Sequence, residues 1–193
     1  HPTSSRRQRQ MCIRDSWNVN QACAIIICSE DIANKLNIPS DKRVYPLASS
    51  ENNHMISTLQ RPNLIEPAGM HLAAKFIMDI CNENNLIPNL YDLYSCFPVA
   101  VQMFAKSLML NDIKDKTVTG AMPFAGGPLN SYVLHSTAKL IEKLRENNGV
   151  GIVTGVSGMM TKQSYALWSK NPCIDFRYEA VSYTHLRAHE TNV

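Results

Sequence analysis

A cysteine beside an expected helix start is the first residue in this sequence that could do chemistry. Cys96 lies in residues 94–98 (YSCFP), where an apolar run ends and Pro98 opens a helical pattern. The positive end of a helix dipole lowers the pKa of a nearby thiol and favours the reactive thiolate. The alternative is a buried cysteine packed beside Phe97 with no chemical role, and these residues taken alone favour that alternative.

A stretch rich in glycine and proline could supply a second set of groups. Residues 119–130 (TGAMPFAGGPLN) contain three glycines and two prolines, and Asn130 is the expected N-cap of a long helix. Gly126 and Gly127 permit close approach of the backbone, and free N–H groups at a helix start can hold an oxyanion or a phosphate. The spacing does not match a phosphate-binding loop or a dinucleotide fingerprint, so a tight turn without a ligand is the alternative.

Three further polar side chains are candidates. Ser157 follows an apolar run in residues 154–158 (TGVSG), where a glycine turn either contacts an oxyanion or simply bends the chain. His135 lies one turn into the long helix, where it could act as an acid or a base, or be packed or solvated without a role. Asp92 precedes the cysteine segment, and we expect it to orient a loop rather than to catalyse.

Apolar runs alternate with helical periodicities, and these indicate the elements that must position the candidate residues. Continuous apolar runs are typical of strands buried on both faces, and apolar residues at spacings of three and four are typical of helices. The alternation predicts an α/β domain in which helices cover a sheet. The expected strands are residues 22–28, 43–48, 89–96, 151–155 and 164–168, and the expected helices follow Ser29, span residues 67–84, begin at Pro98, and run from Asn130 to a stop at residues 147–149.

Charge and hydropathy exclude two classes of partner. The chain of 193 residues has 19 Lys and Arg against 16 Asp and Glu. Residues 1–16 hold four Arg and one Asp, and residues 181–193 hold one of each sign, so residues 17–180 carry 14 basic and 14 acidic side chains. From this balance we expect no nucleic-acid partner. The longest apolar run, residues 22–28, is too short to span a membrane, so we expect no membrane partner either.

Cysteine usage indicates a reducing compartment. Five of the six cysteines fall in residues 17–180, an odd number at irregular spacing, with no Cys-x-x-Cys pair and no zinc-ligand pattern. Cys23, Cys28 and Cys81 have aliphatic neighbours, so we expect them to be small buried hydrophobic residues. The sequence therefore predicts a cytoplasmic protein without a metal site.

The two ends of the chain are explained by one piece of DNA translated on opposite strands. Residues 11–16 (MCIRDS) can be encoded by ATG TGT ATA AGA GAC AGC, whose reverse complement encodes AVSYTH, the sequence of residues 180–185. This element resembles the mosaic-end adapter of transposase-based sequencing libraries. We therefore interpret residues 1–16 and 181–193 as adapter-derived tails and residues 17–180 as an internal fragment of a natural protein.

Three segments in order resemble the C-terminal half of the thiolase superfamily, and in particular proteins labelled acetyl-CoA acetyltransferase. They are residues 92–102 (DLYSCFPVAVQ), 117–136 (TVTGAMPFAGGPLNSYVLHS) and 151–164 (GIVTGVSGMMTKQS), and the similarity extends over residues 17–172. The resemblance implies one half of a five-layered α-β-α-β-α sandwich with a mixed sheet covered by helices. It also implies acyl transfer or Claisen condensation between coenzyme A thioesters, with the thioester as substrate and no separate cofactor.

The resemblance also shows where this sequence departs from the family pattern. Gly127 stands where the family has the His of a Gly-His-Pro turn, Gly155 where it has a second Cys, and Tyr94 where it has an Asn or a His. A glycine side chain cannot carry a proton. Cys96 and His135 are therefore the candidate catalytic replacements. The candidate substrate-binding residues are Tyr94, Phe97 (which matches the family's acyl-pocket Phe), Gly126, Gly127, Asn130 and Ser157.

Three hypotheses of function remain open at this point. The first is a fragment of a thiolase-like acyltransferase, whose partners are acyl-CoA, the missing N-terminal half with its acylated Cys, and a second copy or partner subunit. The second is a non-catalytic acyl-CoA-binding subunit that works with a partner protein. The third is a structural module without a ligand. A half of such a protein should expose surfaces that the other half buries, so we expect the isolated chain to aggregate or stay partly molten.

Overall fold

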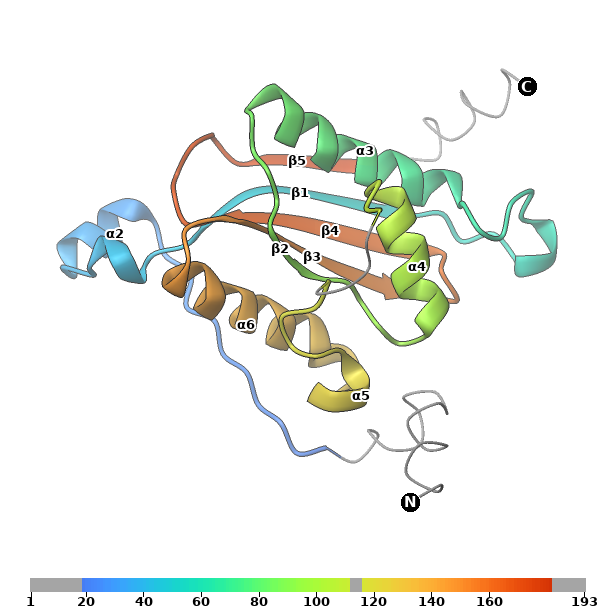
Figure 1. Ribbon diagram of the computed structural model, residues 1–193, viewed down its shortest axis with the longest axis horizontal. Helices are drawn as coiled ribbons and strands as arrows, with labels where there is room; N and C mark the ends of the chain where they lie inside the picture. The colour runs from blue at the N-terminus through green and yellow to red at the C-terminus, as the bar shows by residue number, and fades with distance from the viewer. Residues whose placement is uncertain (1–18, 112–115, 182–193) are drawn as a thin grey trace.

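The structure is a computed structural model that describes residues 19–111 and 116–181. Five strands form one mixed sheet in the order β2-β3-β4-β1-β5, and helices pack on both of its faces (Figure 1). The strands are β1 (Tyr45–Asn53), β2 (Leu90–Asp92), β3 (Val150–Ser157), β4 (Lys162–Ser169) and β5 (Arg177–Val181). The α-helices are α2 (Glu30–Lys35), α3 (Ala68–Glu83), α4 (Pro98–Ser107), α5 (Met122–Ala125) and α6 (Tyr132–Glu146), with short 3₁₀ turns at Ser40–Lys42, Thr58–Gln60 and Leu129–Ser131.

The direction of the strands places several loops at one edge of the sheet. β4 is antiparallel to both β1 and β3, whereas β2 is parallel to β3 and β5 is parallel to β1. The carboxyl ends of β1, β2, β3 and β5 therefore lie at the same edge. Ligands of open α/β sheets bind beyond the carboxyl ends of the strands, so this edge is the place to look for a site.

The two faces of the sheet are covered by different helices. Successive side chains of a strand point to opposite faces. On β3, Ile152 packs in the cluster formed with α3 and α4, while Val153 packs against Leu140 and Leu144 of α6. This two-sided burial explains why β3 is a continuous apolar run in the sequence.

Most of the predicted elements are confirmed. The expected helices at residues 67–84 and from Pro98 correspond to α3 and α4, and Ser29 caps α2 by accepting a hydrogen bond from the Ile32 N–H at 3.3 Å. The strands at residues 151–155 and 164–168 are β3 and β4, each somewhat longer than predicted. The predicted strand at residues 89–96 is shorter, because only Leu90–Asp92 pairs with β3.

The predicted strand at residues 22–28 is wrong for this chain. The segment belongs to no strand of the sheet and runs beside α6 as an extended trace (Figure 1). Cys28 is exposed and Cys23 half-buried, so the expected burial of these two cysteines is wrong as well, whereas Cys81 is buried. The physical reason is that the segment lies against α6, where the Cys23 thiol donates to the Leu134 carbonyl at 3.3 Å, and therefore pairs with neither edge strand of the sheet, β2 or β5.

Strand β5 has no counterpart in the sequence prediction. Its sequence, RYEAV, lacks an apolar run because, among the strands that the structure describes, it lies at the edge of the sheet and pairs with β1 alone. It extends to Val181, which is buried and pairs with Asn52, so the strand includes the first residue of the predicted C-terminal tail. Apart from Val181, both predicted tails lie outside the described residues.

None of the helices in the described ranges combines the length and the apolar character needed to cross a bilayer.

Candidate functional site

A buried carboxylate at the carboxyl end of β2 organises the candidate site. Asp92 is fully buried, and its Oδ2 accepts hydrogen bonds from the backbone N–H groups of Val118 and Thr119 at 3.1 and 3.0 Å. The hydroxyls of Thr117 and Thr119 donate to the same oxygen at 3.1 and 2.8 Å. Asp92 therefore holds the start of the glycine-rich loop against the sheet, as the sequence predicted for a loop-orienting residue.

The other carboxylate oxygen of Asp92 fixes helix α6. Its Oδ1 accepts hydrogen bonds from the Tyr132 hydroxyl at 3.2 Å and the Ser136 hydroxyl at 2.7 Å. These two residues are four apart and share the buried face of the helix. One carboxylate thus links strand β2, the loop after residue 116 and the first turns of α6.

The cysteine segment contacts the glycine-rich loop directly. The Ser95 hydroxyl, which is buried, accepts a hydrogen bond from the Met122 N–H at 2.9 Å. Ala121 adopts the left-handed φ of 67°, and its N–H donates to the Thr117 hydroxyl at 2.8 Å. The first two sequence motifs are therefore in contact, and side-chain hydroxyls supply the hydrogen bonds that the irregular backbone needs.

The third motif joins through Tyr94. The Tyr94 N–H donates to the hydroxyl of Thr154 on β3 at 2.9 Å, and its ring lies edge-on to Tyr132 with centroids 5.5 Å apart. Burial, and secondarily the negative charge of Asp92, raise the pKa of Tyr132 to about 12. Tyr132 is therefore a neutral hydrogen-bond donor at physiological pH.

The candidate nucleophile has the predicted place at a helix start. Cys96 is half-buried and immediately precedes Phe97, the N-cap residue of α4, and Pro98 is the first residue of that helix. Phe97 is also half-buried, in extended backbone with φ −137°. A thiol in this position lies near the positive end of a ten-residue helix.

The diglycine bend lies beside the N-terminal segment. Gly126 has φ +86°, and a Cβ there would lie 2.9 Å from Nε2 of Gln21 and 3.1 Å from Val19. The same Gln21 amide donates to the Ala125 carbonyl at 2.6 Å. The neighbouring Gly127 is half-buried, and its carbonyl accepts from the Leu129 N–H at 2.7 Å. Only a residue without a side chain fits this bend at Gly126 without a shift of its neighbours.

Asn130 does not cap α6, so that prediction is wrong. Residues 129–131 form a 3₁₀ turn, and the helix begins at Tyr132 after the N-cap residue Ser131, whose side chain makes no capping hydrogen bond within the described part of the chain. The Ser131 hydroxyl donates instead to the Pro128 carbonyl at 3.0 Å. Asn130 is exposed, as is Ser157, which ends β3 opposite Lys162. Both residues remain candidates for contact with a ligand, but neither contributes to the Asp92 network.

His135 lies in the first turn of α6, next to Ser136. Its side chain is half-buried, and its Nε2 is buried without a hydrogen-bond partner among the described residues. A buried, unpaired imidazole nitrogen is unfavourable unless it has a partner or a function. The Asp92 hydrogen bonds tie the helix that carries His135 to the strand end that leads to Cys96.

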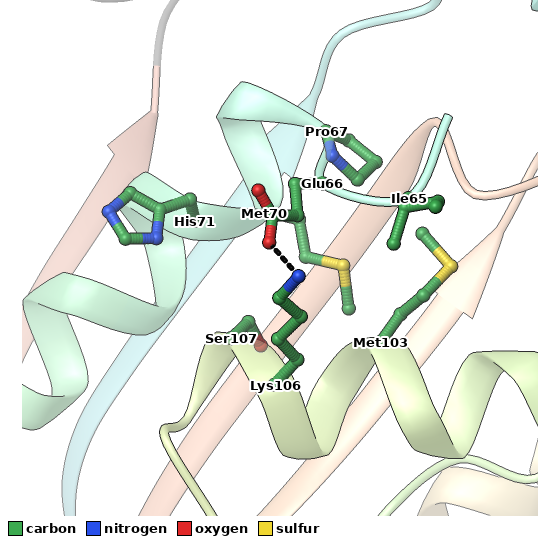
Figure 2. Close-up of a pocket in the computed structure, with 8 residues that line it drawn as sticks. All are labelled: Ile65, Glu66, Pro67, Met70, His71, Met103, Lys106 and Ser107. Carbon is green, nitrogen blue, oxygen red and sulfur yellow. Dashed lines mark ion pairs between the residues drawn. The ribbon is translucent and has the colours of Figure 1, made fainter. Parts of the chain in front are cut away.

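A small hollow that the sequence did not predict lies between α3 and α4 (Figure 2). Met70 and Met103 line it, and the ion pair between Glu66 and Lys106 crosses its mouth. Its volume is about 40 Å³, which holds roughly three waters. The hollow is too small for an organic substrate.

Among residues 19–111 and 116–181, no three His, Cys, Asp or Glu side chains are grouped in a way that could hold a metal ion.

No protein-family model and no curated protein matches this sequence. Its structure is similar to a monomeric SCP2-thiolase-like protein type 1 from Mycobacterium smegmatis, with a TM-score of 0.68 and 25% identity over 83% of this chain. The fold is thiolase-like. Human mitochondrial 3-ketoacyl-CoA thiolase and the Acat5 thiolase from Ascaris suum, solved in complex with coenzyme A, each match 75% of this chain at 20% identity, with TM-scores of 0.55 and 0.50.

The chain spans only about a third of each thiolase-like structure, namely 35%, 34% and 35% of their lengths. The predicted resemblance is thus confirmed for the fold, including its mixed sheet covered by helices.

Sequence reasoning missed the roles of Thr119, Tyr132 and Ser136. The signal was present, because two hydroxyl residues four apart on a helix face can reach one carboxylate at a strand end.

Proposed function

We propose that this chain is the C-terminal half of a member of the thiolase superfamily that acts on coenzyme A thioesters, by acyl transfer or Claisen condensation. The observation that carries the proposal is the contact between the three motifs at the carboxyl edge of a thiolase-like sheet. Asp92, Ser95 and Thr154 make the hydrogen bonds that join them. A structural match to a thiolase solved with coenzyme A supports the class of substrate.

The chemistry of the proposed site differs from the family pattern, because glycines stand at two catalytic positions. At Gly155 a Cβ would lie 2.7 Å from the Ser164 hydroxyl and 3.3 Å from Val133, so the space for a second thiol is taken by neighbouring side chains. In the proposed enzyme Cys96 supplies the thiol and His135 the imidazole. The thioester is bound by Tyr94, Phe97, the Gly126–Gly127 bend, Asn130 and Ser157.

A second function is favoured by the same two glycines. Without the family's His and second Cys, the site lacks the family's usual proton carrier. The alternative is therefore a non-catalytic acyl-CoA-binding subunit that works with a partner protein. In both cases the partners are acyl-CoA, the missing N-terminal half, and either a second copy or a different subunit, in the cytoplasm.

The test uses the full-length parent protein, encoded by the gene upstream and downstream of residues 17–180. Acyl exchange and condensation are measured with acetyl-CoA for the wild type, Cys96→Ala and His135→Asn. Loss of a catalytic acid, base or nucleophile should lower kcat by about 10²–10⁴-fold. Cys173→Ala is the matched control, because Cys173 is an exposed cysteine outside the three motifs and its loss should leave kcat unchanged.

The outcomes separate the two functions. Turnover that depends on Cys96 or His135 supports the enzyme. A parent protein that binds CoA thioesters without exchange or condensation contradicts the enzyme and supports the binding subunit. Failure to bind CoA thioesters contradicts both.

A further inference from the structure

The turn at Ala121 has a backbone conformation that its side chain disfavours. Ala121 has φ +67° and ψ 167°, a combination that glycine adopts freely and other residues rarely adopt. Such a conformation persists only where the surrounding structure holds it. The contacts that hold this turn therefore set the course of the glycine-rich loop, residues 119–130.

Hydroxyl groups hold the turn on both sides of Ala121. The Ala121 N–H donates to the hydroxyl oxygens of Thr117 and Thr119 at 2.8 and 3.2 Å. The next N–H along the chain, that of Met122, donates to the buried Ser95 hydroxyl at 2.9 Å. Each of these hydroxyls can accept from an amide and still donate its own proton.

Both sets of hydroxyls lead to the carboxylate of Asp92. Thr117 and Thr119 donate to its Oδ2 directly, at 3.1 and 2.8 Å. Ser95 reaches it through Tyr132, whose hydroxyl is hydrogen-bonded to the Ser95 side chain and donates to Oδ1 of Asp92 at 3.2 Å. A carboxylate only accepts, so Tyr132 gives its proton to Asp92 and its oxygen accepts from Ser95. The hydrogen bonds therefore run in one direction, from the turn through Ser95 and Tyr132 to the carboxylate.

Tyr132 is the member of this chain that comes from a different element. It is buried in the first turn of α6, whereas Asp92 ends β2 and Ser95 follows it. Its ring also lies edge-on to Tyr94. It therefore contacts three residues of the short segment that leads to Cys96. In a buried site, hydrogen bonds that end on a charge polarise and strengthen one another, so loss of the middle member should loosen the whole chain.

We propose that Tyr132 is a positioning residue, which links Ser95 to Asp92, thereby holds the disfavoured turn at Ala121, and so fixes the glycine-rich loop for the thioester. The inference rests on the proposed function. In this role Tyr132 acts through the loop and exchanges no proton with the substrate. A misplacement of about 1 Å in a positioning group can cost roughly 10²-fold in rate, so the loss should appear in kcat.

Tyr132→Phe in the full-length parent protein tests this role, because it removes the hydroxyl and keeps the ring. With acetyl-CoA as substrate, kcat should fall at least ~10-fold while KM changes less than ~3-fold. Ser95→Ala breaks the same chain at its other end and should have the same effect, and the double variant should be no worse than either single one. Wild-type kcat in both variants, or additive losses in the double variant, would overturn the proposal.

Rescue by Ala121→Gly separates positioning from general stability. Glycine adopts the turn without strain, so the loop no longer depends on the chain. Adding Ala121→Gly to Tyr132→Phe should restore kcat to within ~3-fold of the wild type. Met109→Gly is the matched control, because Met109 has φ +55° beyond the end of α4 and glycine relieves a similar strain there, outside the three motifs. It should leave the kcat of Tyr132→Phe low. Equal rescue by both glycines, or rescue by neither, would overturn the proposal.

Hydrogen–deuterium exchange of the same samples distinguishes failure of this inference from failure of the proposed function. The amides of Ala121 and Met122 should exchange at least ~10-fold faster in Tyr132→Phe than in the wild type. A wild type that does not turn over the thioester contradicts the proposed function, and the positioning role of Tyr132 falls with it. A wild type that does turn it over, with equal exchange of these amides in the variant, contradicts this inference alone.

Discussion

Asp92 is the side chain on which the arrangement of the candidate site depends most. It is fully buried and accepts six hydrogen bonds, from Thr117, Val118, Thr119, Tyr132 and Ser136. Hydrogen bonds to a charged group are worth about 1.5–3 kcal/mol each before the cost of burying the charge is counted. The network is therefore expected to be sensitive to the loss of the charge.

Asp92→Asn should destabilise the full-length protein by about 2–3 kcal/mol. The amide keeps one acceptor oxygen, but its NH₂ faces hydroxyl and N–H groups that donate to Asp92 in the wild type. Urea unfolding measures the change. Asp79→Asn is the matched control, because the contact that Asp79 makes within the described residues is an exposed ion pair with Lys75, and its loss should cost less than about 1 kcal/mol. Equal effects of the two variants would contradict the structural role of Asp92.

Tyr132 gives the site a pH dependence in the alkaline range. Burial raises its pKa to about 12, whereas the unfolded chain ionises near its ordinary value of 10. Between pH 10 and 12 the unfolded state binds fewer protons than the folded state. The free energy of unfolding is therefore unaffected by Tyr132 below about pH 10 and falls by up to about 2–3 kcal/mol as the pH rises to 12. The decline should be shallower in Tyr132→Phe, and identical pH profiles for wild type and variant would rule out this contribution.

Local chemistry made part of the site predictable from the sequence. Asp92 at a strand end and Cys96 before a proline-opened helix follow from neighbouring residues alone. The partners of Asp92 did not follow, because Thr119 and Ser136 are 27 and 44 residues away and only the folded chain brings them together. The expected cap at Asn130 failed because the chain inserts a 3₁₀ turn before the helix.

At the level of elements, strand β3 and helix α6 approach each other closely where glycines replace side chains. A Cβ at Gly151 would lie 2.7 Å from Leu140 of α6, and one at Gly155 would meet Ser164 of β4 and Val133 of α6. The glycine at the family's second-Cys position is therefore part of the packing between these elements as well as a change in the chemistry.

Gly155→Cys should destabilise the full-length protein by about 1–3 kcal/mol, because the new side chain overpacks the space between β3, β4 and α6. Denaturant unfolding provides the measurement. Ser164→Ala removes the nearest atom, so the double variant should recover part of the loss. If Gly155→Cys is as stable as the wild type, the position has room for a thiol and the argument from packing fails.

Helices α3 and α6 and strands β3 and β4 were predictable from sequence, whereas strand β5 and the fate of residues 22–28 were not, and the reason is the range of the interactions. The periodicities of α3 and α6 and the Ser29 cap are local. Strand β5 depends on pairing with β1 more than 120 residues away and has no apolar run of its own. The segment at residues 22–28 has the pattern of a buried strand, but it pairs with none of the strands in the described chain.

For the molecule as a whole, the exposed apolar surface predicts poor behaviour of the isolated chain. Ile26 and Ile27 are exposed in residues 22–28, Leu36 is exposed at the end of α2, and Phe124 and Leu129 are exposed beside the diglycine bend. The 193-residue chain should therefore aggregate or bind a hydrophobic dye and unfold without a sharp transition. Calorimetry of the purified chain checks this, and a sharp cooperative transition of a monomer would contradict it.

The central claim is that the three motifs, joined by the hydrogen bonds of Asp92, Ser95 and Thr154, form a site for a coenzyme A thioester. Isothermal titration of the full-length parent protein with acetyl-CoA tests it most directly, with Asp92→Asn as the comparison. We expect saturable binding by the wild type, weakened at least ~10-fold in the variant because the loop and α6 lose their common anchor. Absence of binding by a folded wild-type protein would contradict the claim.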